Sequence, residues 1–241
     1  MTDSADGADA RDARHALRRR GAERVTATDR YGILLCLLFA TFVFMASAPG
    51  GPGARVVTVA LQGLTLLVVV SVAGARRRFV RLVEVVVVVA FAAALVSVFI
   101  NSTTSGDGVF FALNALLVAA APIVLGRAIW RRGIIDLQTV MGAICIYVLI
   151  GLLFSFVYGA MANLSSGAFF AEQAHATSAD FVYFSFVTLT TVGYGDLTAA
   201  HNLGRSFSAL EGMVGQLYLV TVVAVIVGKL SGGRRDEVRG S

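Results

Sequence analysis

The sequence predicts an all-α integral membrane protein with six transmembrane helices, one re-entrant helix and an extended segment behind it. Of the 241 residues, 57% are hydrophobic and only 15% are charged, which leaves too little polar surface for a soluble globular domain. A helix needs about 20 apolar residues to cross the hydrocarbon. Runs of that length, or nearly so, lie at about 31–49, 56–74, 83–100, 109–127, 138–160 and 206–228.

The chain begins with a tail, residues 1–30, that is rich in alanine, aspartate and arginine. It has too few apolar residues to fold alone, so we expect it to be disordered in the cytoplasm. Ala46-Ser47-Ala48 resembles a small-residue cleavage site. The charged leader is unusually long for a signal peptide and Pro49 follows the site directly, so we expect the first span to be retained.

Arginine placement predicts the orientation of the spans. All but two of the 20 basic residues fall on one side of the predicted spans, and the exceptions are Arg55 and Arg205. The positive-inside rule therefore puts both termini in the cytoplasm. A cluster between the second and third spans faces the inner leaflet and either only anchors the helices or also binds anionic lipids. It consists of Arg76, Arg77, Arg78 and Arg81.

The apolar stretch at about 179–189 is too short to cross the membrane and predicts a re-entrant helix. Ser178 is a suitable N-cap, and Asp180 lies in the first turn, where negative charge suits the helix dipole. The partially negative C-terminal end of this helix would point at the membrane midplane, where it favours a cation.

The segment Thr190-Thr191-Val192-Gly193-Tyr194-Gly195-Asp196 follows that helix. Carbonyl groups point to one side of such a segment only if left- and right-handed backbone conformations alternate. Gly193 and Gly195 adopt positive φ values at little cost. We expect Val192 and Tyr194 to turn outward into surrounding helices, and Thr191 to offer both its carbonyl and its hydroxyl oxygen.

The last span carries two unusual residues. Glu211 is ionisable within a span, which makes it a functional candidate, and we expect it to face Ser185 or Thr188. Its role is either structural, as a neutral or hydrogen-bonded group, or proton-linked gating. Gly215 lies four residues later on the same helix face, where glycine allows close helix packing.

Residues 134–230 resemble the pore domain of the tetrameric potassium channel family, of the bacterial type with six transmembrane helices and one pore loop. Thr191 to Gly195 match the filter pentapeptide already described for potassium channels, so this link rests on resemblance. The resemblance implies K⁺ coordination at Thr191, Val192, Gly193 and Tyr194, with Gly195 completing the selectivity filter. One loop supplies a quarter of a coordination shell, which implies a symmetric homotetramer.

The resemblance also suggests supporting roles. Some bacterial members carry a glutamate at the position of Val187, as a partner for the aspartate after the filter. Here Tyr183 takes the aromatic position beside the filter, and its hydroxyl is a donor for Asp196. Thr190 completes this support. Gly215 matches the bending point of the family's inner helix, so bending and close packing both remain open for it.

Residues 31–133 form a four-helix module in the position of a voltage sensor. In voltage-gated relatives of the family, the fourth span carries arginine at every third residue. Here it has one arginine, Arg127, at its inner edge. Moving one charge through the field is worth about 2.3 kcal/mol per 100 mV, so steep gating needs several charges. We therefore expect no steep voltage dependence.

The function expected is passive conduction of K⁺ in a bacterial plasma membrane, with a short cytoplasmic tail at 231–241. The alternatives are a weakly selective cation channel and a non-conducting membrane subunit that keeps the pore fold. No residues combine into a catalytic set, so we expect neither an enzyme nor a cofactor apart from the permeant K⁺. We also expect no nucleic-acid partner.

Overall fold

A computed structural model of the chain describes residues 31–47, 51–73, 104–132, 137–164 and 167–239, and the single positions 81, 85, 88, 89 and 92. These residues are almost entirely helical, and their one β-type pairing is the isolated bridge between Phe170 and Ala199. The prediction of an all-α fold is confirmed. The helices are Tyr31–Ser47, α2 (Pro52–Ala73), α4 (Thr104–Arg132), α5 (Leu137–Leu164), α6 (Ser178–Leu189) and α7 (Asn202–Arg239).

Four of these helices are long and apolar enough to cross a membrane. They are Gly53–Ala73, Gly108–Arg131, Leu137–Leu164 and Asn202–Val225. The helix Tyr31–Ser47 is apolar but shorter. The chain is thus a multi-pass membrane protein. The predicted tail at 1–30, Arg76 to Arg78 and most of the span at 83–100 lie outside the described residues.

Two helices extend beyond the predicted spans at both ends. The fourth span was expected at 109–127, but α4 runs from Thr104 to Arg132, and α7 extends beyond the predicted 206–228. An apolar run marks only the part of a helix suited to lipid. The helix itself continues where polar residues keep helical propensity in water.

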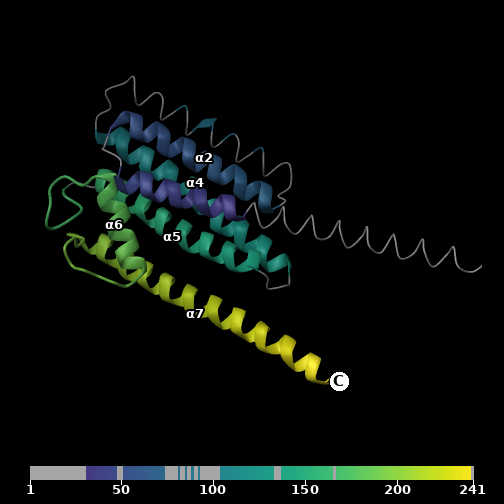
Figure 1. The fold of residues 1–241 in the computed structure, drawn as a ribbon. Coiled ribbons are helices and arrows are strands. Elements are labelled where there is room, and N and C mark those ends of the chain that lie inside the picture. Colours follow the sequence, from purple (N-terminus) through teal and green to yellow (C-terminus); the bar gives the residue numbers. More distant parts are fainter. Residues whose placement is uncertain are drawn as a thin grey trace, which may run out of the picture.

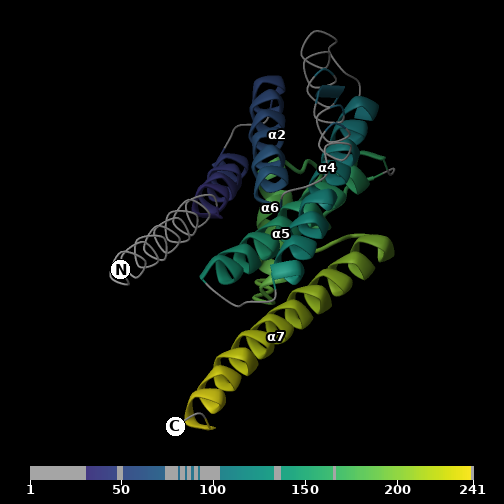
Figure 2. The same ribbon diagram turned by 90° about the vertical axis from the view of Figure 1, so that its right-hand side faces the viewer.

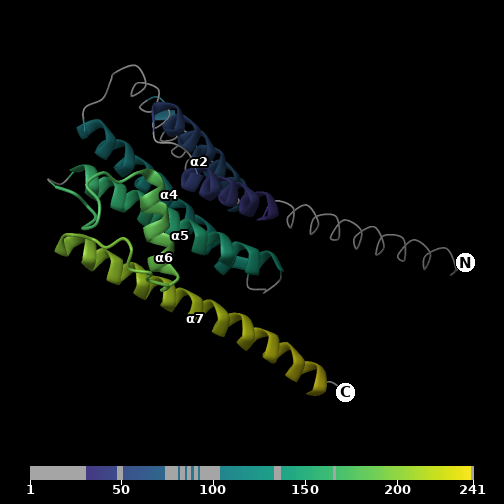
Figure 3. The same cartoon turned by 60° about the vertical axis from the view of Figure 1, so that its left-hand side comes forward.

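The helices form a bundle with α7 along one side (Figures 1 and 2). Helix α4 packs against both α2 and α5, and the short α6 packs against both α5 and α7. Figure 3 shows α6 crossing the space between α5 and α7 at one end of the molecule. This arrangement places the segment after α6 beside α7.

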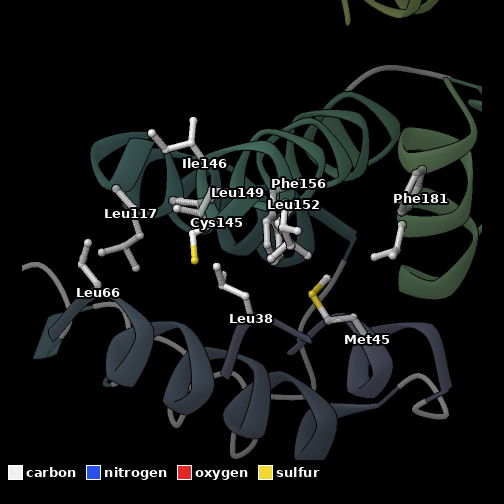
Figure 4. Packing of buried hydrophobic residues seen from close by; sticks show 14 of the residues in the cluster. Leu38, Met45, Leu66, Leu117, Cys145, Ile146, Leu149, Leu152, Phe156 and Phe181 are labelled. Atoms are coloured by element: carbon white, nitrogen blue, oxygen red, sulfur yellow. The ribbon is translucent and has the colours of Figure 1, made fainter. Parts of the chain in front are cut away.

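Aromatic rings join the helix Tyr31–Ser47 and α4 to α5 and α6 of the same chain. Phe42 of the first helix meets Phe186 of α6 with ring centroids 4.7 Å apart. Phe111 of α4 lies 5.8 Å from the Phe181 ring of α6, and it packs so closely on Gly159 that a Cβ there would clash with the ring. The buried apolar residues between these helices form one core, part of which Figure 4 shows.

Candidate functional site

A capping box starts the re-entrant helix α6. Thr177, and not the predicted Ser178, is the N-cap: its backbone is extended, and its hydroxyl oxygen accepts from the Asp180 amide. The Asp180 carboxylate in turn accepts from the Thr177 amide at 2.7 Å. Both threonine and serine suit an N-cap position. The spacing Thr-x-x-Asp, from Thr177 to Asp180, is the sequence signal that favours Thr177 over Ser178.

The segment after α6 is tied back to the helix through its amide groups. Val192 N donates to Val187 O at 3.0 Å, and Gly193 N approaches the same oxygen at 3.4 Å. In a trans peptide the N–H and the preceding C=O point in opposite directions. The carbonyl groups of Thr191 and Val192 therefore point away from α6, toward the open side of the segment.

The backbone of this segment alternates in handedness. Thr191, Gly193 and Gly195 have φ values of 58°, 57° and 80°. Glycine adopts this region at little cost, but a β-branched residue there is strained by about 1–3 kcal/mol. The left-handed Thr191 was not predicted. Its hydroxyl oxygen accepts a 3.0 Å hydrogen bond from Gln216 Nε2 of α7, which holds it in place.

The side chains of Val192 and Tyr194 are exposed on the single chain, 52% and 72% respectively. The described helices of the single chain do not cover them, so their expected outward direction stays a prediction. Thr190, in contrast, is bonded to its own helix. Its hydroxyl donates to Phe186 O at 2.6 Å and so caps the C-terminal end of α6.

A hydrogen bond links α6 to the residue after the segment. The Tyr183 hydroxyl donates to Asp196 Oδ2 at 2.7 Å, which is the contact expected from the sequence. Further out, the Thr198 hydroxyl and amide both donate to the carboxylate of Glu172. These bonds hold the pKa of Glu172 below its ordinary value and fasten the loop before α6 to the chain that follows Asp196.

Glu211 is fully buried behind this segment, between three helices. The Tyr158 hydroxyl of α5 donates to Glu211 Oε2 at 2.6 Å. Ser185 Oγ of α6 lies 2.5 Å from Glu211 Oε1 and 2.7 Å from Gly151 O. Of the two partners expected for Glu211, Ser185 is therefore the one in contact.

The number of protons available to these contacts indicates whether the Glu211 carboxyl group is protonated. The Ser185 hydroxyl has one proton, which serves either Gly151 O or Glu211. Both contacts are satisfied together when the Glu211 carboxyl group itself donates to Ser185. The geometry thus fits a neutral, hydrogen-bonded carboxyl group.

Gly215 lies where α7 meets the end of α6. A Cβ at this position would stand 2.5 Å from Leu189 O and 2.9 Å from a methyl group of the same residue. Only glycine fits this approach. Close packing therefore accounts for Gly215, while bending of α7 at this residue remains a prediction.

Comparisons with known proteins indicate the class of protein to which this segment is similar. Residues 144–231 match the model of a family described as "Ion channel". A segment of 94 residues is 37% identical to the potassium voltage-gated channel protein shk-1 of Caenorhabditis elegans and covers 36% of this chain. Together the two matches support a potassium channel family for this segment of the chain. The aligned segment spans only 17% of the length of shk-1.

These comparisons point to a channel protein and not to an enzyme. The matched segment and its neighbours contain supporting residues that the sequence did not reveal. Tyr158 is separated from Glu211 by 53 positions, and no local pattern joins them. Gln216 was detectable in principle, because an amide side chain within an apolar span needs a partner. Tyr147, which donates to Leu189 O at 3.2 Å, gives no such signal.

Proposed function

We propose that this chain is the subunit of a channel that conducts K⁺ passively through a filter lined by the carbonyl groups of Thr191, Val192, Gly193 and Tyr194. The observation that carries this proposal is the alternating backbone at residues 191, 193 and 195, with the amides of Val192 and Gly193 turned back to α6. Carbonyl dipoles placed in this way replace the hydration shell of a potassium ion.

The channel is proposed to be a homotetramer. A single chain presents one strand of carbonyl groups, which surrounds an ion only when copies meet around an axis. Helix α7 supports this view, since only 11% of its most apolar window is buried within the chain, against 50% for α5. Other copies, together with lipid, would cover the apolar side chains that remain exposed on α7.

The four-helix module is proposed to lack steep voltage sensing. Arg127 and Arg131 are exposed near the C-terminal end of α4. The membrane-crossing part of α4 before them contains no arginine, so a movement of α4 carries little charge through the field. The name of the aligned relative concerns that protein and does not transfer to this module.

The proposed setting is a bacterial plasma membrane with both termini in the cytoplasm. Arg81, the described member of the basic cluster, is exposed, as anionic-lipid binding by Arg76, Arg77, Arg78 and Arg81 requires. The division into a tail (1–30), a four-helix module (31–133), a pore domain (134–230) and a short tail (231–241) remains a prediction.

Single-channel recording of the purified protein in planar bilayers tests the proposal. Under asymmetric K⁺ and Na⁺, the reversal potential should follow the K⁺ gradient. A reversal potential that ignores this gradient would favour the alternative of a weakly selective cation channel. Absence of any current, with correctly assembled protein, would favour a non-conducting subunit.

A Gly193→Ala variant provides a sharper test of the filter. No atom lies within 4 Å of a Cβ built at this position, so the substitution disturbs only the left-handed backbone. We expect K⁺ selectivity to fall while the tetramer still assembles. The same recordings test voltage dependence, because an open probability rising steeply over tens of millivolts would overturn the voltage-insensitive part of the proposal.

A further inference from the structure

A side chain of α7 donates a hydrogen bond to the first residue of the proposed filter. The Nε2 atom of Gln216 lies 3.0 Å from Thr191 Oγ1. Thr190, one residue earlier, bonds through its own hydroxyl to Phe186 O within α6. The Thr191 hydroxyl has no such bond to α6 in the part of the chain that the structure describes. Its position therefore depends on α7.

The backbone from which Gln216 reaches Thr191 is itself held close to the end of α6 (Figure 3). One residue before it, Gly215 packs so tightly that a Cβ there would stand 2.5 Å from Leu189 O. The Tyr147 hydroxyl of α5 donates to the same carbonyl oxygen at 3.2 Å. These contacts fix both ends of the hydrogen bond between α7 and the filter segment.

The direction of this bond leaves the Thr191 hydroxyl oxygen able to bind a cation. Both Thr191 and Gln216 are exposed on the open side of the single chain. A hydroxyl oxygen has two lone pairs, and the amide N–H of Gln216 occupies one of them. The second lone pair is available to an ion, and the bond restrains rotation of the hydroxyl about χ1. Because an amide is neutral, Gln216 holds this oxygen without adding a charge beside the ion path.

We propose that Gln216 is a positioning residue for the cation site at the Thr191 end of the filter. This inference rests on the proposed function, in which Thr191 offers oxygen ligands to K⁺. Residues that hold a metal ligand in place typically change the metal affinity by about 10–100-fold when they are mutated. Loss of the Gln216 donor should therefore weaken cation binding at this site and leave the carbonyl groups of Val192, Gly193 and Tyr194 in place.

Block of the K⁺ current by Ba²⁺, measured on the full-length channel in planar bilayers, tests the proposal. Ba²⁺ has nearly the radius of K⁺ and twice its charge, so it competes for the same oxygen ligands. Gln216→Met keeps the length of the side chain and removes the N–H donor. With Ba²⁺ on the side that reaches Thr191 first, we expect the half-blocking concentration to rise about tenfold. Leu217→Met is the matched control, because Leu217 is also exposed on α7 and has no donor to lose, so its block should be unchanged.

Variants of Thr191 test whether Gln216 acts through the hydroxyl group. A Thr191→Ser protein keeps the hydroxyl, so adding Gln216→Met should still weaken the block. A Thr191→Val protein lacks it, so adding Gln216→Met should have no further effect. Equal effects in the two backgrounds would overturn the proposal. If a Thr191 variant carries no current, the Ba²⁺ concentration that raises the Tm of the tetramer gives the same comparison.

The failure of this inference is distinguishable from the failure of the proposed function. A wild-type reversal potential that ignores the K⁺ gradient counts against the function. If the wild type is selective for K⁺ and Ba²⁺ blocks the Gln216→Met variant as it blocks the wild type, only the role of Gln216 is wrong. A lower Tm of that variant with unchanged block would leave Gln216 with a structural role alone and would contradict the proposal.

Discussion

The pore domain and the four-helix module differ in where their buried polar side chains form hydrogen bonds, although Ser155 of α5 also bonds within its own helix. In the pore domain, hydroxyl groups donate from one helix to another: Tyr158 to Glu211, Tyr147 to Leu189 and Tyr218 to Ala143. In the module, Thr41, Thr58, Thr65 and Asn114 donate to carbonyl groups four residues earlier in their own helices.

This difference shows where the structure fixes helix positions. A hydrogen bond between helices is lost when one helix slides or rotates, whereas a bond within a helix moves with it. Apolar packing supplies most of the attraction between the module helices and sets their register less strictly. We infer that the pore helices are held in one arrangement, as a filter of fixed dimensions requires, and that the module tolerates displacement.

Gly215→Ala should have the largest effect on the fixed arrangement of the pore. The added methyl group would stand 2.5 Å from Leu189 O, a backbone atom that cannot rotate away. We therefore expect the free energy of unfolding to fall by about 3 kcal/mol per chain. Thermal unfolding of the tetramer and single-channel recording measure it. Gly212→Ala is the control, because its methyl group would lie 3.8 Å from Thr188 O. Normal conduction by the Gly215→Ala variant would contradict close packing.

Removal of the hydrogen bonds around Glu211 should have the next largest effect. Glu211→Leu leaves the buried hydroxyl of Tyr158 without its partner, which costs about 1–3 kcal/mol of stability, while Ser185 still donates to Gly151 O. Glu211→Gln should preserve stability and K⁺ selectivity, because its amide donates to Ser185 and accepts from Tyr158 as a neutral acid does. Thermal unfolding distinguishes the two variants.

The same Glu211→Gln protein separates the two roles left open for this residue. A structural role predicts gating with unchanged pH dependence. If a pH dependence of the wild-type channel disappears in the variant, proton-linked gating is favoured instead.

Tyr183→Phe should have a smaller effect and lower the stability by about 1 kcal/mol. It removes the donor to Asp196 Oδ2 at the exposed end of the filter, where water partly replaces it. We expect faster loss of conduction during long openings, measured as shorter bursts in single-channel records. Asp196→Asn keeps an acceptor for Tyr183 and should behave more like the wild type. Bursts of equal length in the wild type and the Tyr183→Phe variant would show that this hydrogen bond does not support the filter.

Thr58→Val should have the smallest effect. The Thr58 hydroxyl bonds only to Ala54 O of its own helix, and that carbonyl keeps its place in the helix when the hydroxyl is removed. We expect a change within about 0.5 kcal/mol in thermal unfolding. A loss comparable to that of Glu211→Leu would mean that the module also depends on specific polar contacts, and the contrast with the pore domain would not hold.

The sequence predicted the parts of the fold that depend on local chemistry. The expected re-entrant helix at about 179–189 agrees with Ser178–Leu189, and the outer helix at 138–160 agrees with Leu137–Leu164, because each is an apolar run bounded by polar residues. The positive φ values of Gly193 and Gly195 follow from glycine itself. That of Thr191 does not, since it depends on Gln216 from another helix.

Contacts between distant parts of the chain were the least predictable. Glu211 was recognised as unusual because an ionisable residue stands in an apolar helix. Its partners depend on how three helices cross, and this is determined by glycine contacts such as those of Gly151 with Phe186 and Gly215 with Leu189. No periodicity in one segment contains that information. The buried amide of Gln62 in α2, which has no hydrogen-bond partner among the described residues, likewise becomes visible only when the surrounding helices are in place.

Only four residues, 133–136, separate the end of α4 from the start of α5. Such a connection spans at most about 18 Å, and Phe111 of α4 already packs on Phe156 and Phe181 of its own chain. In the proposed tetramer each module is thus tethered to its own quarter of the ring. In a mixed tetramer, a subunit with an altered module would therefore first displace α5 of the same subunit. The change in conduction would then increase stepwise with the number of altered subunits.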